Sequence, residues 1–256
     1  MPFTLAHPAA ILPIPLLLGR FCVFAALVVG SVAPDLPYFV GDPLKRRTTH
    51  TLASVFWFSL PVGWVAYLIF EHSIRRSAVF LLPTPLRARL SAAPRRPEFA
   101  AVSLSILLGA LTHVAWDVLT HEAEALESAA SQLGLGDASF FGFPIWSYGV
   151  MQFANTILGV VVLALATGFW FARTPAHPVP PSTDREAATR RAGRFILLGS
   201  PLVAAPLIAL ALAPPGDTAL HTWIILAAHA LVSGVTTATV VLILAGIWLR
   251  LRDRGG

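Results

Sequence analysis

The residues best suited to chemistry lie in one stretch of sequence where polar side chains follow small ones at a constant interval. The series is Ala101, Ser105, Gly109, His113, Asp117 and His121. Residues four apart share one slowly drifting face of a helix. The small residues allow a neighbouring backbone to approach closely, and the three polar residues then point into whatever that neighbour encloses. His, Asp and His at successive turns have the spacing of metal ligands.

His113 and Asp117 carry the stronger argument for a functional role. Both lie in an apolar run, where an unpaired carboxylate costs free energy, so a partner or a cation is expected. His121 stands at the boundary with an acidic segment, where an ordinary polar helix end explains it equally well. We predict that His113 and Asp117 are functional and keep His121 as a further candidate ligand.

Three more polar residues are expected at the level where this helix ends. Asp35 follows the first apolar hairpin, His50 precedes the next apolar run, and His7 stands at the start of the hairpin. His7 joins the others only if the first thirty residues turn back on themselves. Since a catalytic zinc takes about three ligands from protein, the six candidates suggest two metals, or one metal with hydrogen-bonding partners.

The sequence limits the chemistry of such a metal but does not name it. Cys22 is the only cysteine, so within one chain His and carboxylate side chains must supply the ligands. These suit zinc, iron, manganese or nickel; a divalent metal is expected, with zinc as the first to test. Gln152 and Asn155, near the start of a later apolar run, are candidates for hydrogen bonds to the site, although polar contacts between helices explain them equally well.

The elements that position these residues are apolar helices. Hydrophobic residues make up 56% of the chain and charged residues 12%, with a mean hydropathy of +0.72, which leaves too little polar surface for a soluble domain. Charge-free runs cover residues 51–70, 99–116, 138–171, 195–216 and 218–249. A helix crosses a bilayer with about 20 residues. We therefore predict an all-α fold, a polytopic helical membrane bundle whose partner is the lipid bilayer.

The first thirty residues predict a short helical hairpin ahead of about five transmembrane helices. Arg20 divides them into two apolar stretches, each too short to cross at about 20 residues per span. A single long helix would instead place a guanidinium in the membrane at a cost of roughly 3 kcal/mol. We expect the turn near Gly19 and Arg20. Because no basic residues precede the apolar stretch, we expect the segment to stay in the protein rather than act as a cleaved signal.

Loop charges predict the orientation and the parts of the chain. Six arginines between residues 75 and 96, and three more between 250 and 254, place those segments in the cytoplasm. The Lys45–Arg47 loop is an exception, because it is basic and this topology places it outside the cell. Topology explains the net charge of +5 better than nucleic acid does, and no nucleic-acid partner is expected. We divide the chain into a membrane core with the metal site (1–172), a cytoplasmic linker (173–194) and two C-terminal transmembrane helices (195–256).

Four segments together resemble a known family. They are MPFTLAHPAA at residues 1–10, GSVAPDLPYF at 30–39, Thr49 with His50, and HVAWDVLTH at 113–121. They resemble an uncharacterised bacterial family of multi-pass membrane proteins, which is similar to metal-dependent hydrolases of bacterial inner membranes. The likeness spans approximately residues 1–160. It implies a place in the cell membrane and metal ligation by His7, Asp35, His50, His113 and Asp117, with His121 adjoining. Those hydrolases usually carry an acidic residue where this chain has Pro37.

Three functions remain open from the sequence. The first is a membrane-embedded metal-dependent hydrolase of an amphiphilic ester or phosphoester, in which a spare His or Asp acts as base. The second is an ion or proton transporter or relay that uses the same polar residues, although no internal repeat is visible. The third is a metal-stabilised membrane scaffold without turnover. The sequence has no nucleotide-binding glycine loop, GxSxG elbow or HExxH motif.

Overall fold

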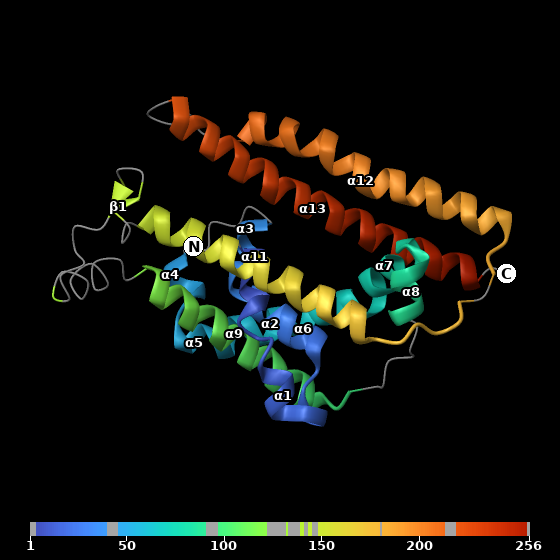
Figure 1. The fold of residues 1–256 in the computed structure, drawn as a ribbon, viewed down its shortest axis with the longest axis horizontal. Coiled ribbons are helices and arrows are strands. Elements are labelled where there is room, and N and C mark those ends of the chain that lie inside the picture. The colour runs from blue at the N-terminus through green and yellow to red at the C-terminus, as the bar shows by residue number, and fades with distance from the viewer. Residues whose placement is uncertain are drawn as a thin grey trace. The chain divides into compact units, whose positions relative to one another are not determined.

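The prediction of an all-α polytopic bundle is confirmed by the computed structural model. It describes residues 4–39, 46–90, 97–121, 132, 139–140, 143–144, 148–179, 181–212 and 219–254. Five of the described helices are long and apolar enough to cross a membrane: Leu52–Leu81, Phe99–Val118, Phe153–Arg173, Asp184–Leu212 and His229–Asp253. Within the described ranges, the β-structure is one antiparallel pair of two-residue strands, β1 (Ser139–Phe140) and β2 (Phe143–Pro144). Figure 1 shows the order of the elements.

The N-terminal segment forms the predicted helical hairpin. It consists of a 3₁₀ helix η1 (Thr4–Ala9), α1 (Ile14–Leu18), a 3₁₀ turn η2 (Gly19–Phe21) and α2 (Phe24–Val32). Gly19 ends α1 with a φ of 51°, a left-handed conformation that glycine adopts without steric cost. The turn therefore falls where the sequence predicts it. A further 3₁₀ turn η3 (Ala33–Asp35) and α3 (Leu36–Phe39) follow.

The next transmembrane segment contains two π-helical turns. Its parts are α4 (Arg46–Thr49), α5 (Leu52–Ser54), the π-turn η4 (Val55–Ser59), α6 (Leu60–Ile69), the π-turn η5 (Phe70–Ile74), α7 (Arg75–Leu81) and then α8 (Thr84–Leu90). Thr51 and Ser54 form a reciprocal cap at its start, in which each hydroxyl accepts from the other's backbone N–H. This cap fixes the backbone next to His50.

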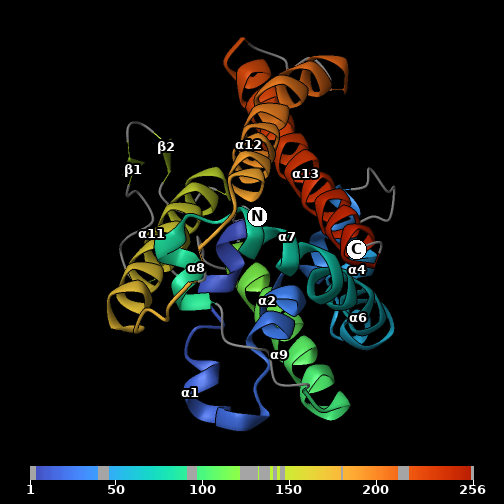
Figure 2. The same ribbon diagram turned by 90° about the vertical axis from the view of Figure 1, so that its right-hand side faces the viewer.

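The chain divides into two compact units. The first unit, Met1–Pro37, Pro43–Tyr67 and Arg95–Arg173, is built around the contact of α2 with α9 (Phe99–His121), which lie side by side in Figure 2. Glycine makes this approach possible: a Cβ on Gly30 would lie 2.3 Å from Ile106 O, and one on Gly109 would lie 2.3 Å from Leu27 O. The backbone N–H of Val23 also donates to Ser105 Oγ at 2.9 Å. The small residues of the predicted α9 face thus serve as the contact.

The third long helix of the sequence holds the N-terminus of the first unit in place. It is α11 (Tyr148–Arg173), and it packs on η1. At the contact, a Cβ on Gly159 would lie 2.7 Å from Ala6 Cβ. Because Ala6 directly precedes His7, this contact sets the position of a candidate ligand.

The second unit comprises Tyr38–Asp42, Leu68–Pro94 and Thr174–Gly256. Its long helices α12 (Asp184–Leu212) and α13 (Ala219–Arg254) lie side by side (Figure 1). Helix α13 also packs on η5 and α7, where Ser77 Oγ donates to Leu242 O at 2.7 Å. Helix α12 begins at Asp184, inside the segment predicted as a linker; the division of the chain at residues 172 and 194 stays a prediction.

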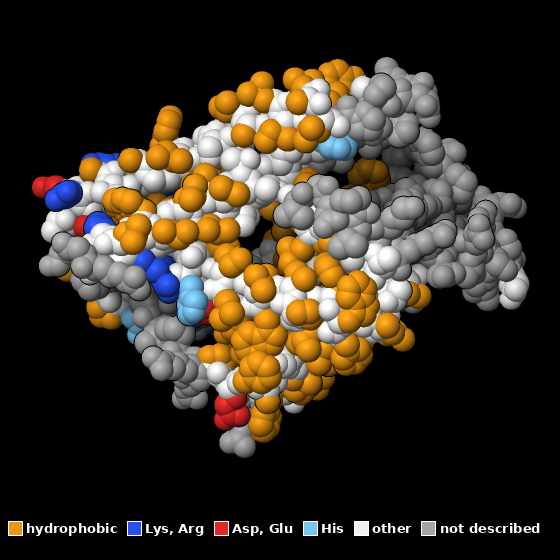
Figure 3. Space-filling view, turned by 180° about the vertical axis from the view of Figure 1, so that it is seen from behind, with side chains coloured by type: hydrophobic (Ala, Val, Ile, Leu, Met, Phe, Trp, Pro, Cys, Tyr) orange, Lys and Arg blue, Asp and Glu red, His pale blue; other side chains and the backbone are white. Residues whose placement is uncertain are grey.

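Exposed apolar side chains occur on the helices of both units. In Figure 3, hydrophobic side chains cover much of the described surface that faces the viewer. They include Phe153 on α11, Leu202 on α12 and Leu244 on α13, each more than half exposed. Such surfaces are compatible with lipid as solvent rather than water. The chain is a multi-pass helical membrane protein.

Candidate metal centre

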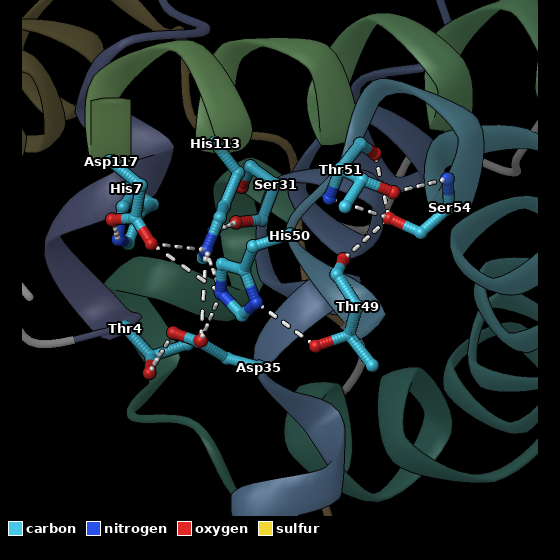
Figure 4. A network of polar contacts seen from close by, with 10 residues as sticks. All are labelled: Thr4, His7, Ser31, Asp35, Thr49, His50, Thr51, Ser54, His113 and Asp117. Atoms are coloured by element: carbon cyan, nitrogen blue, oxygen red, sulfur yellow. Dashed lines mark hydrogen bonds and ion pairs between the residues drawn. The ribbon is translucent and has the colours of Figure 1, made fainter. Parts of the chain in front are cut away.

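Helix α9 supplies two buried polar side chains one turn apart. His113 is 0% exposed and Asp117 is 1% exposed, and both follow Gly109, where α9 meets α2. The Nδ1 atom of His113 lies 2.7 Å from the backbone oxygen of Ser31. Because a carbonyl oxygen only accepts hydrogen bonds, Nδ1 carries the proton and Nε2 is left with a lone pair. That lone pair points toward the other side chains of the cluster (Figure 4).

Asp35 joins the cluster from the turn η3, and its side chain is fully buried. Thr4 Oγ1 donates to Asp35 Oδ2 at 2.6 Å. The other carboxylate oxygen, Oδ1, lies 3.1 Å from His50 Nε2 and 3.6 Å from His113 Nε2. Pro34 and Pro37 flank Asp35, and their fixed φ angles limit the conformations of this turn. Asp35 thus accepts from Thr4 with one oxygen and presents the other oxygen to both histidines.

His50 reaches the cluster from the short connection between α4 and α5. Its Nδ1 lies 2.9 Å from Thr49 Oγ1. Its Nε2 lies 3.2 Å from His113 Nε2 and 3.4 Å from Asp117 Oδ2. Ser54 Oγ, from the cap of α5, donates to the backbone oxygen of Thr49 at 2.8 Å and so fixes the loop that carries the imidazole.

His7 is the least conventional member of the cluster. Its ring stacks on that of His113, with centroids 3.8 Å apart, and its Nε2 lies 3.6 Å from Asp117 Oδ1. The residue is 1% exposed, yet neither ring nitrogen has a hydrogen-bond partner among the residues that the structure describes. A buried imidazole without hydrogen bonds is costly. This observation fits a residue that faces a bound ion or a water molecule on that ion.

The cluster fits a divalent metal ion by geometry. Two groups of three could hold one: His50 with His113 and Asp117, and His7 with Asp35 and His113, the ligand atoms of each lying within 4.8 Å of one another. In a tetrahedral site with bonds of about 2.0 Å, ligand atoms lie about 3.3 Å apart. In the first group the three separations are 3.2, 3.4 and 3.7 Å.

Charge and proton placement support the same conclusion. Asp35 and Asp117 are two buried carboxylates, and a divalent cation would neutralise both while the histidines stay neutral. His113 belongs to both groups, but its Nδ1 already donates to Ser31. With Nε2 as its one free ligand atom, His113 can bind a single metal ion. The geometry therefore fits one metal better than two.

The structure brings five of the eight predicted site residues together. His7, Asp35, His50, His113 and Asp117 meet in one cluster, as their places in the topology predict. The side chains of His121 and Gln152 lie outside the described residues, although both backbones are in helices. Asn155 is a partly buried residue of α11. The role of each of the eight residues in a metal site stays a prediction.

Sequence reasoning missed Thr4, the backbone of Ser31 and the hydroxyl of Thr49 as members of the network. A threonine next to a candidate histidine, as at Thr49, was a usable signal for a hydrogen bond. For Thr4 the signal was weaker, because the sequence shows only that it lies in the same opening segment as His7. The contribution of Ser31 is a backbone carbonyl, which a residue pattern cannot reveal.

Fold and site together define a multi-pass helical membrane protein with a buried His and Asp cluster that could hold a metal ion. The chain belongs to the family described as Domain of unknown function (DUF4184), which matches residues 1–248. No curated protein and no solved structure matches it. Membership of an uncharacterised family is thereby confirmed, while the bacterial origin and the likeness to metal-dependent hydrolases stay predictions.

Proposed function

We propose that this protein is a membrane-embedded metal-dependent hydrolase that cleaves an ester or phosphoester bond in an amphiphilic substrate. The observation that carries the proposal is the convergence of ligand atoms from His50, His113 and Asp117. Three protein ligands leave a fourth position of a tetrahedral metal open for water or substrate, which distinguishes catalytic from structural zinc sites. Zinc is the first metal to test.

The residues around the proposed ligands have separate roles. A bound divalent metal would lower the pKa of a water molecule and polarise a substrate oxygen. Thr49 Oγ1, 2.9 Å from His50 Nδ1, would orient that imidazole through the nitrogen that does not bind the metal. Asp35, held by Thr4, lies with Oδ1 3.1 Å from His50 Nε2 and would add negative charge beside the metal. His7, without a hydrogen-bond partner in the described part of the chain, is placed to accept a proton from the reacting water.

The position of the cluster indicates the kind of substrate. Its ligands lie in and beside an apolar helix near the end that we predict to face the exterior, so a molecule with an apolar part would reach it from the bilayer. The His50 side chain has an exposure of 5%, against 2% for Asp117 and 0% for His113. We therefore expect substrate to approach on the His50 side, with the C-terminus of the chain in the cytoplasm on the opposite face.

A proton relay is the second candidate. The 3.2 Å separation between His113 Nε2 and His50 Nε2 is also a hydrogen-bond distance, and a shared proton would connect His113 to both aspartates through His50. Such a relay requires no metal. Metal content therefore separates the two functions.

The decisive experiment measures metal by elemental mass spectrometry on protein purified in detergent without added metal. Wild type is compared with a His113→Ala, Asp117→Ala double variant and with His72→Ala, which removes a histidine from η5 outside the cluster. We expect about one metal per chain in wild type and in His72→Ala, and none in the double variant. Circular dichroism checks that each protein is helical. Absence of metal from wild type would contradict the hydrolase and favour the relay.

Activity is tested once metal is found. Wild type and the double variant are incubated with chromogenic acyl esters and phosphoesters dispersed in detergent, and product release is followed by absorbance. Turnover by wild type alone would support the hydrolase. Stoichiometric metal with no turnover of either bond class would favour the scaffold.

A further inference from the structure

A second cluster of charged side chains lies in the other compact unit, where its helices change from apolar to basic. Five arginines contribute to this basic cluster: Arg76, Arg87, Arg190, Arg194 and Arg252. On α12 the last charge before the apolar run is Arg194, and on α13 the apolar run ends at Leu249. These changes mark the level at which a membrane helix enters the headgroup region.

Aromatic rings hold two of the guanidinium groups in place. The Cζ atom of Arg190 lies 5.0 Å from the centroid of the Phe80 ring, and that of Arg252 lies 6.0 Å from the same ring. Arg252 also lies 5.3 Å from the centroid of Trp248. A cation near a ring face is attracted by the ring, but two cations on one ring repel each other. Phe80 therefore gathers like charges that nearby anions must balance.

The third guanidinium that contacts this region is fixed by backbone oxygens. Arg194 donates from Nε to Leu81 O at 2.6 Å and from an Nη atom to Leu82 O at 2.9 Å. These carbonyls end α7, where helical C=O groups lack intrahelical partners. Arg194 thus adds positive charge to the cluster, and no carboxylate in the described part of the chain pairs with it.

The described carboxylates are too few to balance the cluster. Asp253 pairs with Arg76 and lies 3.6 Å from Arg252 Nε. Glu186 lies 3.7 Å from an Nη atom of Arg190, longer than a hydrogen bond. The side chain of Arg190 is only 12% exposed. Its Nε atom is buried and has no hydrogen-bond partner in the described structure.

The surroundings of Arg87 show the same excess of positive charge. The pKa of Arg87 lies below its ordinary value, first because burial disfavours the charged form and then because Arg190 repels it. Glu186 acts in the opposite direction, and Arg194 adds to the repulsion. An added anion would favour the charged form of Arg87 and so offset the effects of burial and of the neighbouring arginines.

We propose that the basic cluster binds the phosphate group of an anionic phospholipid. Guanidinium groups bind phosphate oxygens through paired hydrogen bonds, and the unpartnered Nε of Arg190 supplies a donor. Phospholipid phosphates lie at the level of the cluster in any bilayer. Just beyond it on α12, Phe195 and Leu198 are 80% and 69% exposed, so acyl chains have an apolar surface to lie against. This site is separate from the proposed metal centre and does not depend on it.

The test measures thermal unfolding in a neutral detergent while one phosphate source is titrated. The sources are phosphatidylglycerol, zwitterionic phosphatidylcholine and inorganic phosphate. We compare wild type with an Arg190→Gln, Arg252→Gln double variant. The control is Arg89→Gln on α8, whose guanidinium donates to Pro85 O of its own helix. Each arginine near the membrane surface should contribute about fivefold to the affinity for an anionic lipid. The double variant should therefore need roughly 25-fold more phosphatidylglycerol for the same rise in Tm.

Wild type and Arg89→Gln should respond alike to phosphatidylglycerol and less to the other two sources. An equal response of wild type and double variant would overturn the site. A rise caused equally by inorganic phosphate would overturn its assignment to a lipid. If the double variant does not fold, Arg190→Lys is used instead, because it keeps the charge and loses the planar donor set. An unchanged response in Arg190→Lys would then contradict the proposal.

Discussion

The Nε2 atoms of His113 and His50 lie 3.2 Å apart, although the two residues are separated by 63 positions in sequence. The Nδ1 of His113 donates to Ser31 O, so the Nε2 of a neutral His113 has only a lone pair to offer. Two lone pairs at this distance repel unless something positive lies between them or one Nε2 carries a proton. The pair therefore requires either a metal ion or a proton.

Metal removal should destabilise the protein. A ligand at 100 times its Kd stabilises the folded state by about 2.7 kcal/mol, so a strong chelator should lower the Tm of wild type. The Tm of the His113→Ala, Asp117→Ala variant should not respond to the chelator, because it has no metal to lose. Thermal unfolding followed by tryptophan fluorescence measures both. A chelator effect of equal size in the two proteins would contradict a metal at this site.

Replacing Thr4 with Val should destabilise the protein through Asp35. The substitution keeps the branched shape and removes the donor that lies 2.6 Å from a buried carboxylate oxygen. A hydrogen bond to a charged group contributes about 1.5–3 kcal/mol, and we expect a loss of unfolding free energy in that range. The control is Thr189→Val on α12, whose hydroxyl donates to the backbone oxygen of Arg185 in an exposed position. A loss as small as in this control would show that Thr4 does not hold Asp35.

A methyl group on Gly109 should separate α2 from α9. Its Cβ would lie 2.3 Å from Leu27 O, and backbone atoms cannot move aside without shifting a helix. We expect a loss of about 1–3 kcal/mol. Gly168→Ala is the matched control, because nothing lies within 4 Å of its added Cβ, and it should be neutral or stabilising by about 0.5–1 kcal/mol. Both are measured by unfolding in detergent; equal effects would contradict the close contact.

Gly159→Ala should weaken metal binding without touching a ligand. The added Cβ would lie 2.7 Å from Ala6 Cβ and 3.0 Å from Ala6 O, which displaces η1 and with it His7. Loss of a supporting contact in a metal site lowers affinity by about 10- to 100-fold. Competition with a chromogenic chelator measures the affinity, and Gly168→Ala on the same helix is again the control. An unchanged affinity in a folded Gly159→Ala variant would remove His7 from the site.

The sequence predicted the cluster because topology and helix period are visible in it. The four-residue spacing places His113 and Asp117 on one face of α9, and the count of membrane crossings places Asp35 and His50 at the same end. The turn at Gly19 follows from two apolar stretches too short to span. A hairpin returns the chain to the side of the membrane where it began. The sequence therefore predicted that His7 joins the cluster if the hairpin forms.

Other features could not be predicted from residue types. The hydrogen bond from His113 to Ser31 involves a backbone oxygen, which every residue has. The π-turns η4 and η5 each add a residue to a helical turn, and they lie in unlike surroundings: η4 is in an apolar stretch, whereas η5 contains Glu71 and His72, so no common residue pattern marks the change. The start of α12 did have a signal, since Thr183 accepts from the backbone N–H of Glu186 at 3.2 Å, in the pattern of a helix N-cap.

The hairpin at Gly19 has a consequence for the order in which the protein is made. Asp35 enters the membrane at the end of the hairpin, yet its partners His50 and His113 are synthesised later, and His113, on α9, is the last of them. Until His50 is made, Thr4 is the only one of these partners that can contact the carboxylate of Asp35, and His113 joins only with α9. We therefore expect the hairpin to complete its insertion together with α9 rather than ahead of it, so that a nascent chain cut before residue 113 leaves residues 4–32 at the bilayer surface.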